Sequence, residues 1–150
     1  MVIFLLRIRK GDFFPFDVGI GAMLPAHGTS MGKVLVAFSP PKKKKLILEN
    51  MTFRSLTVHS ITSREAFIDE INKAKEKGFA INYEEVSIGV CGVSAPIINK
   101  KGEAIAAISI SSSTAKYSKS DIEKNFAQAI VQSAKQISEA LTQLESPQLR

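Results

Sequence analysis

Polar and hydrophobic positions alternate at the start of the chain. Residues 1–9 are rich in β-branched and aromatic side chains, and residues 13–20 repeat this pattern after the turn signal Lys-Gly-Asp at 10–12. Alternation on both sides of a turn predicts a β-hairpin built from these two stretches.

Helical signals follow the predicted hairpin. Residues 24–30 form a predicted loop that leads into a helix with Thr29 or Ser30 as its N-cap. This helix is expected to end near Ser39, where Ser-Pro-Pro begins a second helix with Ser39 as N-cap and Pro40 as its first residue. The buried side of the second helix is expected to carry Leu46, Ile47 and Leu48.

Two further helices are predicted from capping boxes. Thr62 and Glu65 open the first of them, and Gly78 ends it. Its apolar positions recur at helical spacing at Phe67, Ile71 and Ala74. Ser120 and Glu123 open the second, which is longer. Its apolar face is formed by Ile122, Phe126, Ile130, Ile137, Leu141 and Leu144.

Three strands are predicted between these helices, over residues 79–83, 90–98 and 103–112, and a turn at 99–102 joins the last two. No segment repeats and no low-complexity linker divides the chain. We therefore expect one domain over residues 1–150. Hairpins at both ends of the strand order favour an α+β fold, in which helices pack on a mixed or antiparallel sheet.

Length and composition fit one cytoplasmic domain. The chain has 150 residues, of which 45% are hydrophobic, and a formal net charge of +6. A single cysteine, Cys91, excludes an intrachain disulfide and agrees with a reducing compartment. The apolar run 2–6 is too short for a signal peptide or a membrane span. We expect a cytoplasmic protein that does not contact membranes.

The positive charge is concentrated near the N-terminus. Residues 1–50 hold 8 basic and 3 acidic side chains, against 6 and 6 in residues 51–100 and 6 and 5 in residues 101–150. The run Lys42–Lys45 supplies half of the basic residues in the first third. Consecutive lysines on a helix point all round its axis, which favours a solvated helix end over a nucleic-acid contact.

The segment from His27 to Lys33 partly matches motifs of nucleotide-binding and acyl-transfer proteins. A phosphate-binding loop would need glycine in place of His27 and a hydroxyl in place of Val34. Ser30 and Lys33 have the spacing of the nucleophile motif of penicillin-recognising acyl enzymes, but the partner motifs Ser-x-Asn and Lys-Thr-Gly are absent. A capped helix is favoured over a small hydrolase that uses these two residues.

The start of the same helix has the features of an anion-binding site. Its small residues leave backbone N–H groups free at the positive end of the helix dipole. On this segment alone, an anion site and a plain capped helix packed by Val34, Leu35 and Phe38 are equally supported.

The strand 106–112 carries a second candidate. With a period of two, Ala107, Ser109 and Ser111 share one face, while the alternate, apolar residues share the other. The serine face is either an ordinary solvent-facing side or the floor of a small polar cavity, and the first is favoured.

Metal and acid–base signals are weak. Cys91, His27 and His59 lie far apart without ligand-pair spacing, so we expect no metal and no cofactor. Glu84 and Glu85 are adjacent in a predicted extended segment and would point to opposite faces, so at most one of them serves a given site. We expect no enzymatic activity.

Taken together, the segments resemble the C-terminal effector-binding domain of IclR-type transcriptional regulators. No single motif decides this; the order and spacing of the series do, and the likeness covers nearly the whole chain. The matching stretches are LPAHGTSMGK at 24–33, ITS at 61–63, KGFAINYEE at 77–85, Gly89, SAPI at 94–97 and AAISIS at 106–111.

The resemblance implies a GAF-like sheet that encloses a small organic or aromatic acid. It implies that the effector carboxylate meets the backbone at Ser30 and Met31 and the hydroxyls of Ser109 and Ser111. Helix-end N–H groups and two hydroxyls can hold a carboxylate without a metal or an arginine. The remaining implied lining residues are Leu24, Asn82, Val90 and Gly92.

Two positions depart from the pattern of glyoxylate- and pyruvate-responsive members, which have an acid in place of Asn82 and a cysteine in place of Gly92. We expect a different and larger ligand. The winged helix-turn-helix domain that precedes this domain in the family is absent from the chain, so we expect DNA contact only through a domain not present here. The resemblance also implies a homodimer or tetramer; a stand-alone ligand-binding module is the alternative.

Overall fold

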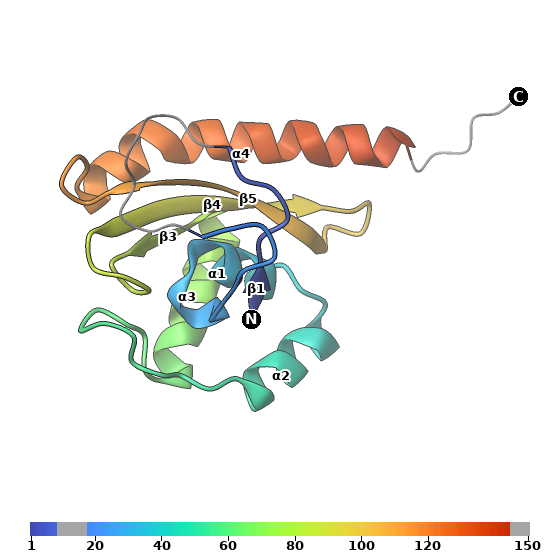
Figure 1. Cartoon of the computed structure of the whole chain (residues 1–150). Helices are drawn as coiled ribbons and strands as arrows, with labels where there is room; N and C mark the ends of the chain where they lie inside the picture. Colours follow the sequence, from blue (N-terminus) through green and yellow to red (C-terminus); the bar gives the residue numbers. More distant parts are fainter. Residues whose placement is uncertain (9–17, 145–150) are drawn as a thin grey trace, which may run out of the picture.

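The computed structural model of the chain describes residues 1–8 and 18–144. Its elements follow one another in the order strand, strand, helices, three strands and a long helix (Figure 1). They are β1 (Val2–Ile3), β2 (Met23–Leu24), the 3-10 helix η1 (Ala26–Gly28), α1 (Ser30–Ala37), α2 (Pro41–Asn50), α3 (Arg64–Lys77), β3 (Ala80–Tyr83), β4 (Val90–Ile98), β5 (Ala104–Ser113) and α4 (Lys119–Leu144).

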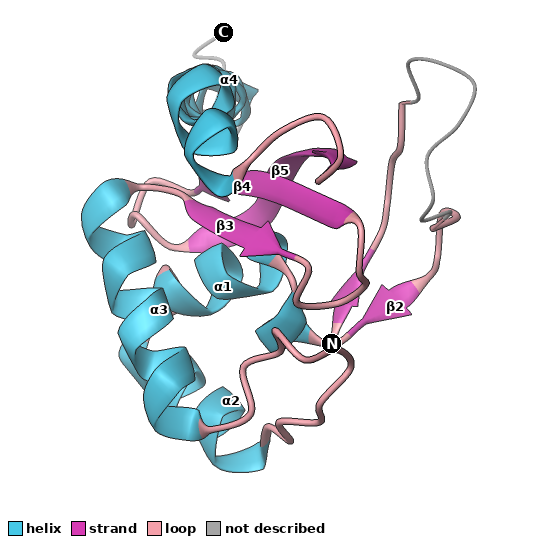
Figure 2. Ribbon diagram, turned by 90° about the vertical axis from the view of Figure 1, so that its left-hand side faces the viewer, coloured by secondary structure: helices cyan, strands magenta, loops and turns pink. Residues whose placement is uncertain are grey.

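The centre of the molecule is the antiparallel sheet β3-β4-β5. Helix α4 covers one face of this sheet, and α1 and α3 lie on the other (Figure 2). The predicted α+β class and the three predicted strands are confirmed: β4 matches its expected bounds, β3 begins one residue later than expected, and β5 is shifted by one residue.

Each face of the sheet has its own core. On the α4 face, Val93 and Cys91 of β4 pack with Ile122 and Ile130 of α4, and all four are buried. On the α1 face, Val34 packs with buried side chains of α3, and the same cluster includes Phe67, Ile71 and Ala74 as predicted. The alternation of β4 and β5 residues therefore sends their apolar side chains mainly toward α4 and leaves small and polar side chains toward α1.

The helix caps confirm part of the sequence prediction. Thr29 is the N-cap of α1, and its Oγ1 accepts the N–H of Gly32 at 3.0 Å. Gly78 ends α3 with φ +78°, as predicted. The N-cap of α3 is Ser63, one residue after the predicted Thr62. At α4 the reciprocal box is formed by Ser118 and Asp121, two residues before the predicted pair.

The prediction for the start of α2 is wrong. Ser39 does not cap the helix, because its hydroxyl donates to the carbonyl of Leu35 at 2.7 Å, and Pro40 occupies the N-cap position. The expected burial of Leu46 is also wrong: its side chain is 61% exposed. Ile47 and Leu48 do pack at the edge of the core formed by α1 and α3, because α2 lies at the periphery and turns only one side inward.

The N-terminal hairpin exists with a different second strand. Val2 pairs with Leu24 and Ile3 with Met23, and Phe4 continues the ladder through Ala22. Residues 18–20 form no strand, and residues 9–17 lie outside the described part. Gly21 adopts φ +84°, which allows a turn directly before β2. After this turn β2 pairs with β1.

The apolar face of α4 is only partly as predicted. Ile122 and Ile130 are buried, but Leu144 is 83% exposed at the last residue of the helix. The other buried positions of α4 carry smaller side chains, those of Ala127, Ala134 and Ser138. No helix in the described residues is long and apolar enough to span a membrane.

Candidate functional site

The beginning of α1 meets the polar face of the sheet. Ser30, the first residue of α1, hydrogen-bonds through its hydroxyl to that of Ser94 on β4 at 2.7 Å. Both side chains are buried. Ser94 pairs with Ser109 of β5, whose hydroxyl donates to the carbonyl of Val93 at 3.3 Å. The Ser30 and Ser94 hydroxyls are therefore in contact, and Ser109 lies beside Ser94 on the neighbouring strand.

Two backbone N–H groups at this helix start donate no hydrogen bond within the described residues. Thr29 takes the N–H of Gly32 through its side chain and that of Lys33 through its carbonyl. The N–H groups of Ser30 and Met31 occupy the first two positions of α1 and have no intrahelical acceptor. They lie at the positive end of the helix dipole.

Gly32 allows this helix start to lie against η1. A Cβ at position 32 would clash with the backbone of Ala26, including its carbonyl oxygen. Glycine is therefore required for the close contact between α1 and η1. This contact holds the start of α1 against η1.

A second row of candidate residues crosses the sheet beside the serines. Asn82 of β3 pairs with Gly92 of β4, and Gly92 pairs with Ser111 of β5. A Cβ on Gly92 would lie 3.1 Å from the Ser111 hydroxyl oxygen, so the glycine leaves this hydroxyl uncovered from the β4 side. Val90 precedes Gly92 by two positions and shares its face. Leu24 lies in β2, outside this three-stranded sheet.

Lys33 is buried in an ionic contact and is not available to activate Ser30. Its side chain is 1% exposed, and Nζ donates to Glu85 Oε1 at 2.7 Å and to the Ile81 carbonyl at 2.8 Å. Glu70 Oε2 of α3 is 3.5 Å away. Since the Ser30 hydroxyl bonds to Ser94, the nucleophile–base arrangement of an acyl enzyme is not formed.

The two adjacent glutamates join different networks, but they lie in the turn after β3 and not in the extended segment expected from the sequence. Burial raises the pKa of Glu85, and the neighbouring Lys33 opposes this shift. Its Oε2 is buried without a hydrogen-bond partner in the described residues. Glu84 adopts φ +59° and accepts the Gly89 N–H and the Thr114 hydroxyl, which lower its pKa.

The loop from 51 to 63 is tied to the turn that follows β3. The Thr57 hydroxyl donates to the Glu84 carbonyl at 2.6 Å, and the Ser60 hydroxyl donates to the Glu85 carbonyl at 2.7 Å. His27 of η1 bonds to the Arg54 carbonyl at 2.9 Å through Nε2. Helix α1, the β3–β4 turn and this loop are therefore held together around the candidate site.

The possible metal ligands do not come together. No group of three or more His, Cys, Asp or Glu side chains in the described residues could hold a metal ion. His27 is buried and packs against Phe53, with ring centroids 5.6 Å apart. Cys91 lies in the core beneath α4, where burial raises the pKa of its thiol. His27 and Cys91 therefore pack in the interior of the protein and do not face a shared metal position.

The run Lys42–Lys45 lies on α2, at the end of the molecule farthest from α4 (Figure 1). Lys42, Lys43 and Lys45 are exposed, and Lys45 makes an ion pair with Glu49 at 3.8 Å. Burial and the neighbouring Lys75 lower the pKa of Lys44. The solvated arrangement expected from the sequence is therefore observed for three of the four lysines.

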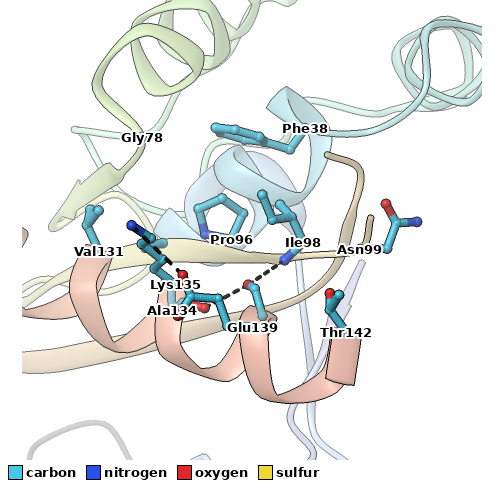
Figure 3. Close-up of a pocket in the computed structure, with 12 residues that line it drawn as sticks. Phe38, Gly78, Pro96, Ile98, Asn99, Val131, Ala134, Lys135, Glu139 and Thr142 are labelled. Carbon is cyan, nitrogen blue, oxygen red and sulfur yellow. Dashed lines mark hydrogen bonds and ion pairs between the residues drawn. The ribbon is translucent and has the colours of Figure 1, made fainter. Parts of the chain in front are cut away.

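Surface hollows lie away from the candidate site. One, of about 370 Å³, is an apolar groove between the C-terminal half of α4 and the end of β4, with Phe38 on one side and Val131, Lys135 and Thr142 of α4 on the other (Figure 3). Another, between α2 and α3, is lined by Lys44, Leu48, Arg64 and neighbouring residues. Neither contains any of the eight residues implied by the resemblance.

Sequence reasoning missed Ser94 and the pairing of Lys33 with Glu85. Ser94 alternates with Gly92 and shares its face, so the pattern of β4 contained a signal for it. The contact of its hydroxyl with Ser30 depends on how α1 crosses the sheet, which no local pattern reveals. The partner of Lys33 lies 52 positions along the chain.

Comparison with known proteins decides the family. Residues 2–139 match the family model described as the C-terminal domain of the bacterial transcriptional regulator IclR. The chain belongs to this family. It is 33% identical over 122 residues to the HTH-type transcriptional regulator XynR of Escherichia coli K12, an alignment that covers 81% of this chain and 48% of XynR.

Solved structures of the IclR family share the fold. A Rhodococcus sp. RHA1 protein assigned as a transcriptional regulator superposes with a TM-score of 0.84 at 29% identity, covering 91% of this chain and 55% of that one. IclR of Thermotoga maritima gives a TM-score of 0.84 at 27% identity, with coverages of 90% and 54%. The chain thus spans about half the length of these relatives. XynR and IclR act in transcription, and the IclR-type resemblance is confirmed at the level of family and fold.

Proposed function

We propose that this chain is the effector-sensing part of an IclR-type transcriptional regulator and that it binds a small organic or aromatic acid. The observation that carries the proposal is the meeting of the α1 start with the serine face of the sheet, where the Ser30 and Ser94 hydroxyls lie 2.7 Å apart. The effector carboxylate would accept from the N–H groups of Ser30 and Met31 and from the hydroxyls of Ser109 and Ser111. The further lining residues are Leu24, Asn82, Val90 and Gly92.

The chemistry of this site suits an anion without a metal. Backbone N–H groups at a helix start combine hydrogen-bond donors with a favourable dipole. Hydroxyls next to them add charge-assisted hydrogen bonds. Lys33 is a buried cation, but its ammonium group already donates to Glu85 and to the Ile81 carbonyl. The N–H groups at the start of α1 would therefore compensate the negative charge of the effector carboxylate.

The regulatory mechanism belongs to the whole protein. We infer that DNA is contacted through an N-terminal winged helix-turn-helix domain, that the chains associate as dimers or tetramers in the cytoplasm, and that no catalysis takes place. An effector can shift such an assembly only by the difference between its affinities for the two arrangements. A stand-alone ligand-binding module would bind the same acid without any effect on DNA.

A thermal-shift panel of small carboxylic acids tests the proposal. An acid at a hundredfold excess over its dissociation constant adds about 2.7 kcal/mol to the free energy of unfolding. The double variant Ser109→Ala/Ser111→Ala should abolish this stabilisation. The matched control is Ser112→Ala, because Ser112 lies between positions of the serine face and points to the other side. A panel in which no acid stabilises the wild type would contradict the function. An acid response that survives the double variant would contradict the site.

A further inference from the structure

Helix α2 carries positive charge at its start, where the helix dipole disfavours it. Its N-cap is Pro40, which has no side-chain acceptor, and its first turn contains no acidic residue. Lys42, Lys43 and Lys44 lie in this turn, at the positive end of the dipole. None of the residues of α2 is buried. The start of α2 therefore concentrates positive charge at the surface of the molecule.

The side of α3 next to α2 is cationic as well. The residues that share this side at helical spacing are Arg64, Ile68, Asn72 and Lys75, and none of them is acidic. Burial lowers the pKa of Lys44, and the charge of Lys75 lowers it further. No ion pair joins α2 to α3 within the residues that the structure describes. Like charges therefore lie on both sides of the space between the two helices.

The hollow between α2 and α3 combines this charge with apolar side chains. It has a volume of about 400 Å³, and Leu48 and Ile68 line it. Its charged lining residues are three cations and one acid, namely Lys44, Lys45, Arg64 and Glu49. Glu49 pairs with Lys45 at 3.8 Å, so Lys44 and Arg64 have no carboxylate partner within the described residues. Charge and polarity together favour a partner that carries acidic groups beside an apolar side chain.

The apolar side chains distinguish between two classes of polyanion. A DNA duplex presents its phosphates on a hydrated, polar backbone and would leave Leu48 and Ile68 without apolar contacts. An acidic amphipathic peptide carries apolar side chains at helical spacing, and such helices bind in apolar grooves. The Lys45–Glu49 pair is exposed and contributes little, so Lys45 can turn to a carboxylate of the partner. These observations favour the peptide.

We propose that the hollow between α2 and α3 is a docking surface for an acidic, amphipathic segment of a partner protein. Carboxylates of the segment pair with Lys44, Lys45 and Arg64, and an apolar side chain lies between Leu48 and Ile68. Carboxylates between the two helices also offset the repulsion of the cations on either side. The surface is separate from the proposed effector site, because none of the residues assigned to that site lines the hollow.

Fluorescence polarisation measures the docking directly. The probe is a fluorescein-labelled helical peptide in which leucines at positions i and i+4 lie among glutamates. The variant Lys44→Gln/Lys45→Gln/Arg64→Gln should weaken binding of this peptide by about tenfold or more, a difference of about 1.4 kcal/mol. The substitutions remove like charges from the surface, so the variant is expected to keep its fold, which circular dichroism checks.

Matched proteins and peptides separate docking from general electrostatic attraction. The control variant Lys101→Gln/Lys116→Gln/Lys124→Gln removes three exposed cations from other elements. It should leave the affinity within about twofold of the wild type, because salt screens distant charges. Two altered peptides test the surface without any variant protein. Replacing every glutamate by glutamine, or every leucine by serine, should in each case weaken binding to the wild type by about tenfold or more.

The docking surface is overturned if the labelled peptide does not bind, if both triple variants bind it equally, or if either altered peptide binds as well as the original. A short DNA duplex serves as competitor. If the duplex displaces the labelled peptide at a lower concentration than the unlabelled peptide does, the hollow binds nucleic acid and the proposed partner is wrong. Weaker displacement by the duplex than by the unlabelled peptide supports the acidic segment.

Discussion

Replacing Lys33 by methionine should destabilise the fold far more than the same replacement at Lys77. Both lysines make an ion pair with an N–O distance of 2.7 Å, to Glu85 and Glu123 respectively. They differ in burial: the Lys33 side chain is 1% exposed and that of Lys77 is 52% exposed. The side chain and the length of the ion pair are therefore matched, whereas Lys33 is buried and donates a further hydrogen bond to the Ile81 carbonyl.

The magnitudes follow from this difference. Removing one partner of a buried pair leaves an uncompensated charge and costs about 3–5 kcal/mol. An exposed pair contributes about 0–1 kcal/mol. A domain has a total stability of about 5–15 kcal/mol, so Lys33→Met removes a large part of it, whereas Lys77→Met does not. The double variant Lys33→Met/Glu85→Gln should recover part of the loss, because no buried charge is then left without a partner.

Urea unfolding followed by circular dichroism measures these differences in free energy. The defect of Lys33→Met should also be smaller at pH 5 than at pH 8. The pKa of Glu85 is already raised by burial, and loss of Lys33 raises it further. A group with a raised native pKa stabilises the native state at low pH and loses this contribution as pH rises through that pKa. Equal losses for Lys33→Met and Lys77→Met at pH 8 would refute the reasoning.

Three further changes have defined outcomes. Thr29→Ala removes the acceptor of the Gly32 N–H and should cost about 1 kcal/mol in thermal or urea unfolding, whereas Thr62→Ala, at an exposed threonine, should leave the stability nearly unchanged. Gly32→Ala places a Cβ against the Ala26 backbone and should cost about 1–3 kcal/mol, and an unchanged melting temperature would contradict the close contact. Glu84 has a lowered native pKa, so its contribution is present above pH 4.5 and is lost as pH falls; Glu84→Gln should therefore weaken the acid-side loss of stability in urea titrations between pH 6 and pH 3.

The prediction from sequence was most accurate where local periodicity and neighbouring residues act alone. The apolar spacing of Phe67, Ile71 and Ala74 and the left-handed Gly78 gave α3 with its C-terminus in the correct place. The same reasoning failed at Ser39, whose hydroxyl turned back to the preceding helix instead of capping the next. It also failed for the second strand of the N-terminal hairpin, since strand pairing depends on residues distant in sequence.

The candidate site was predictable as two separate segments only. The sequence alone indicated a helix that starts with free N–H groups at Ser30 and a strand that carries Ser109 and Ser111 on one face. The tertiary structure decided that the helix start and the strand meet through Ser94. It also decided that Lys33 forms an ion pair with Glu85 and does not contact Ser30. The physical reason is that periodicity and capping are set within a few residues, whereas strand register and helix packing are set by the whole core. The hydrogen bond from the Glu85 N–H to Asn82 Oδ1, formed across the turn in which Glu84 adopts a positive φ, likewise became visible only in the folded chain.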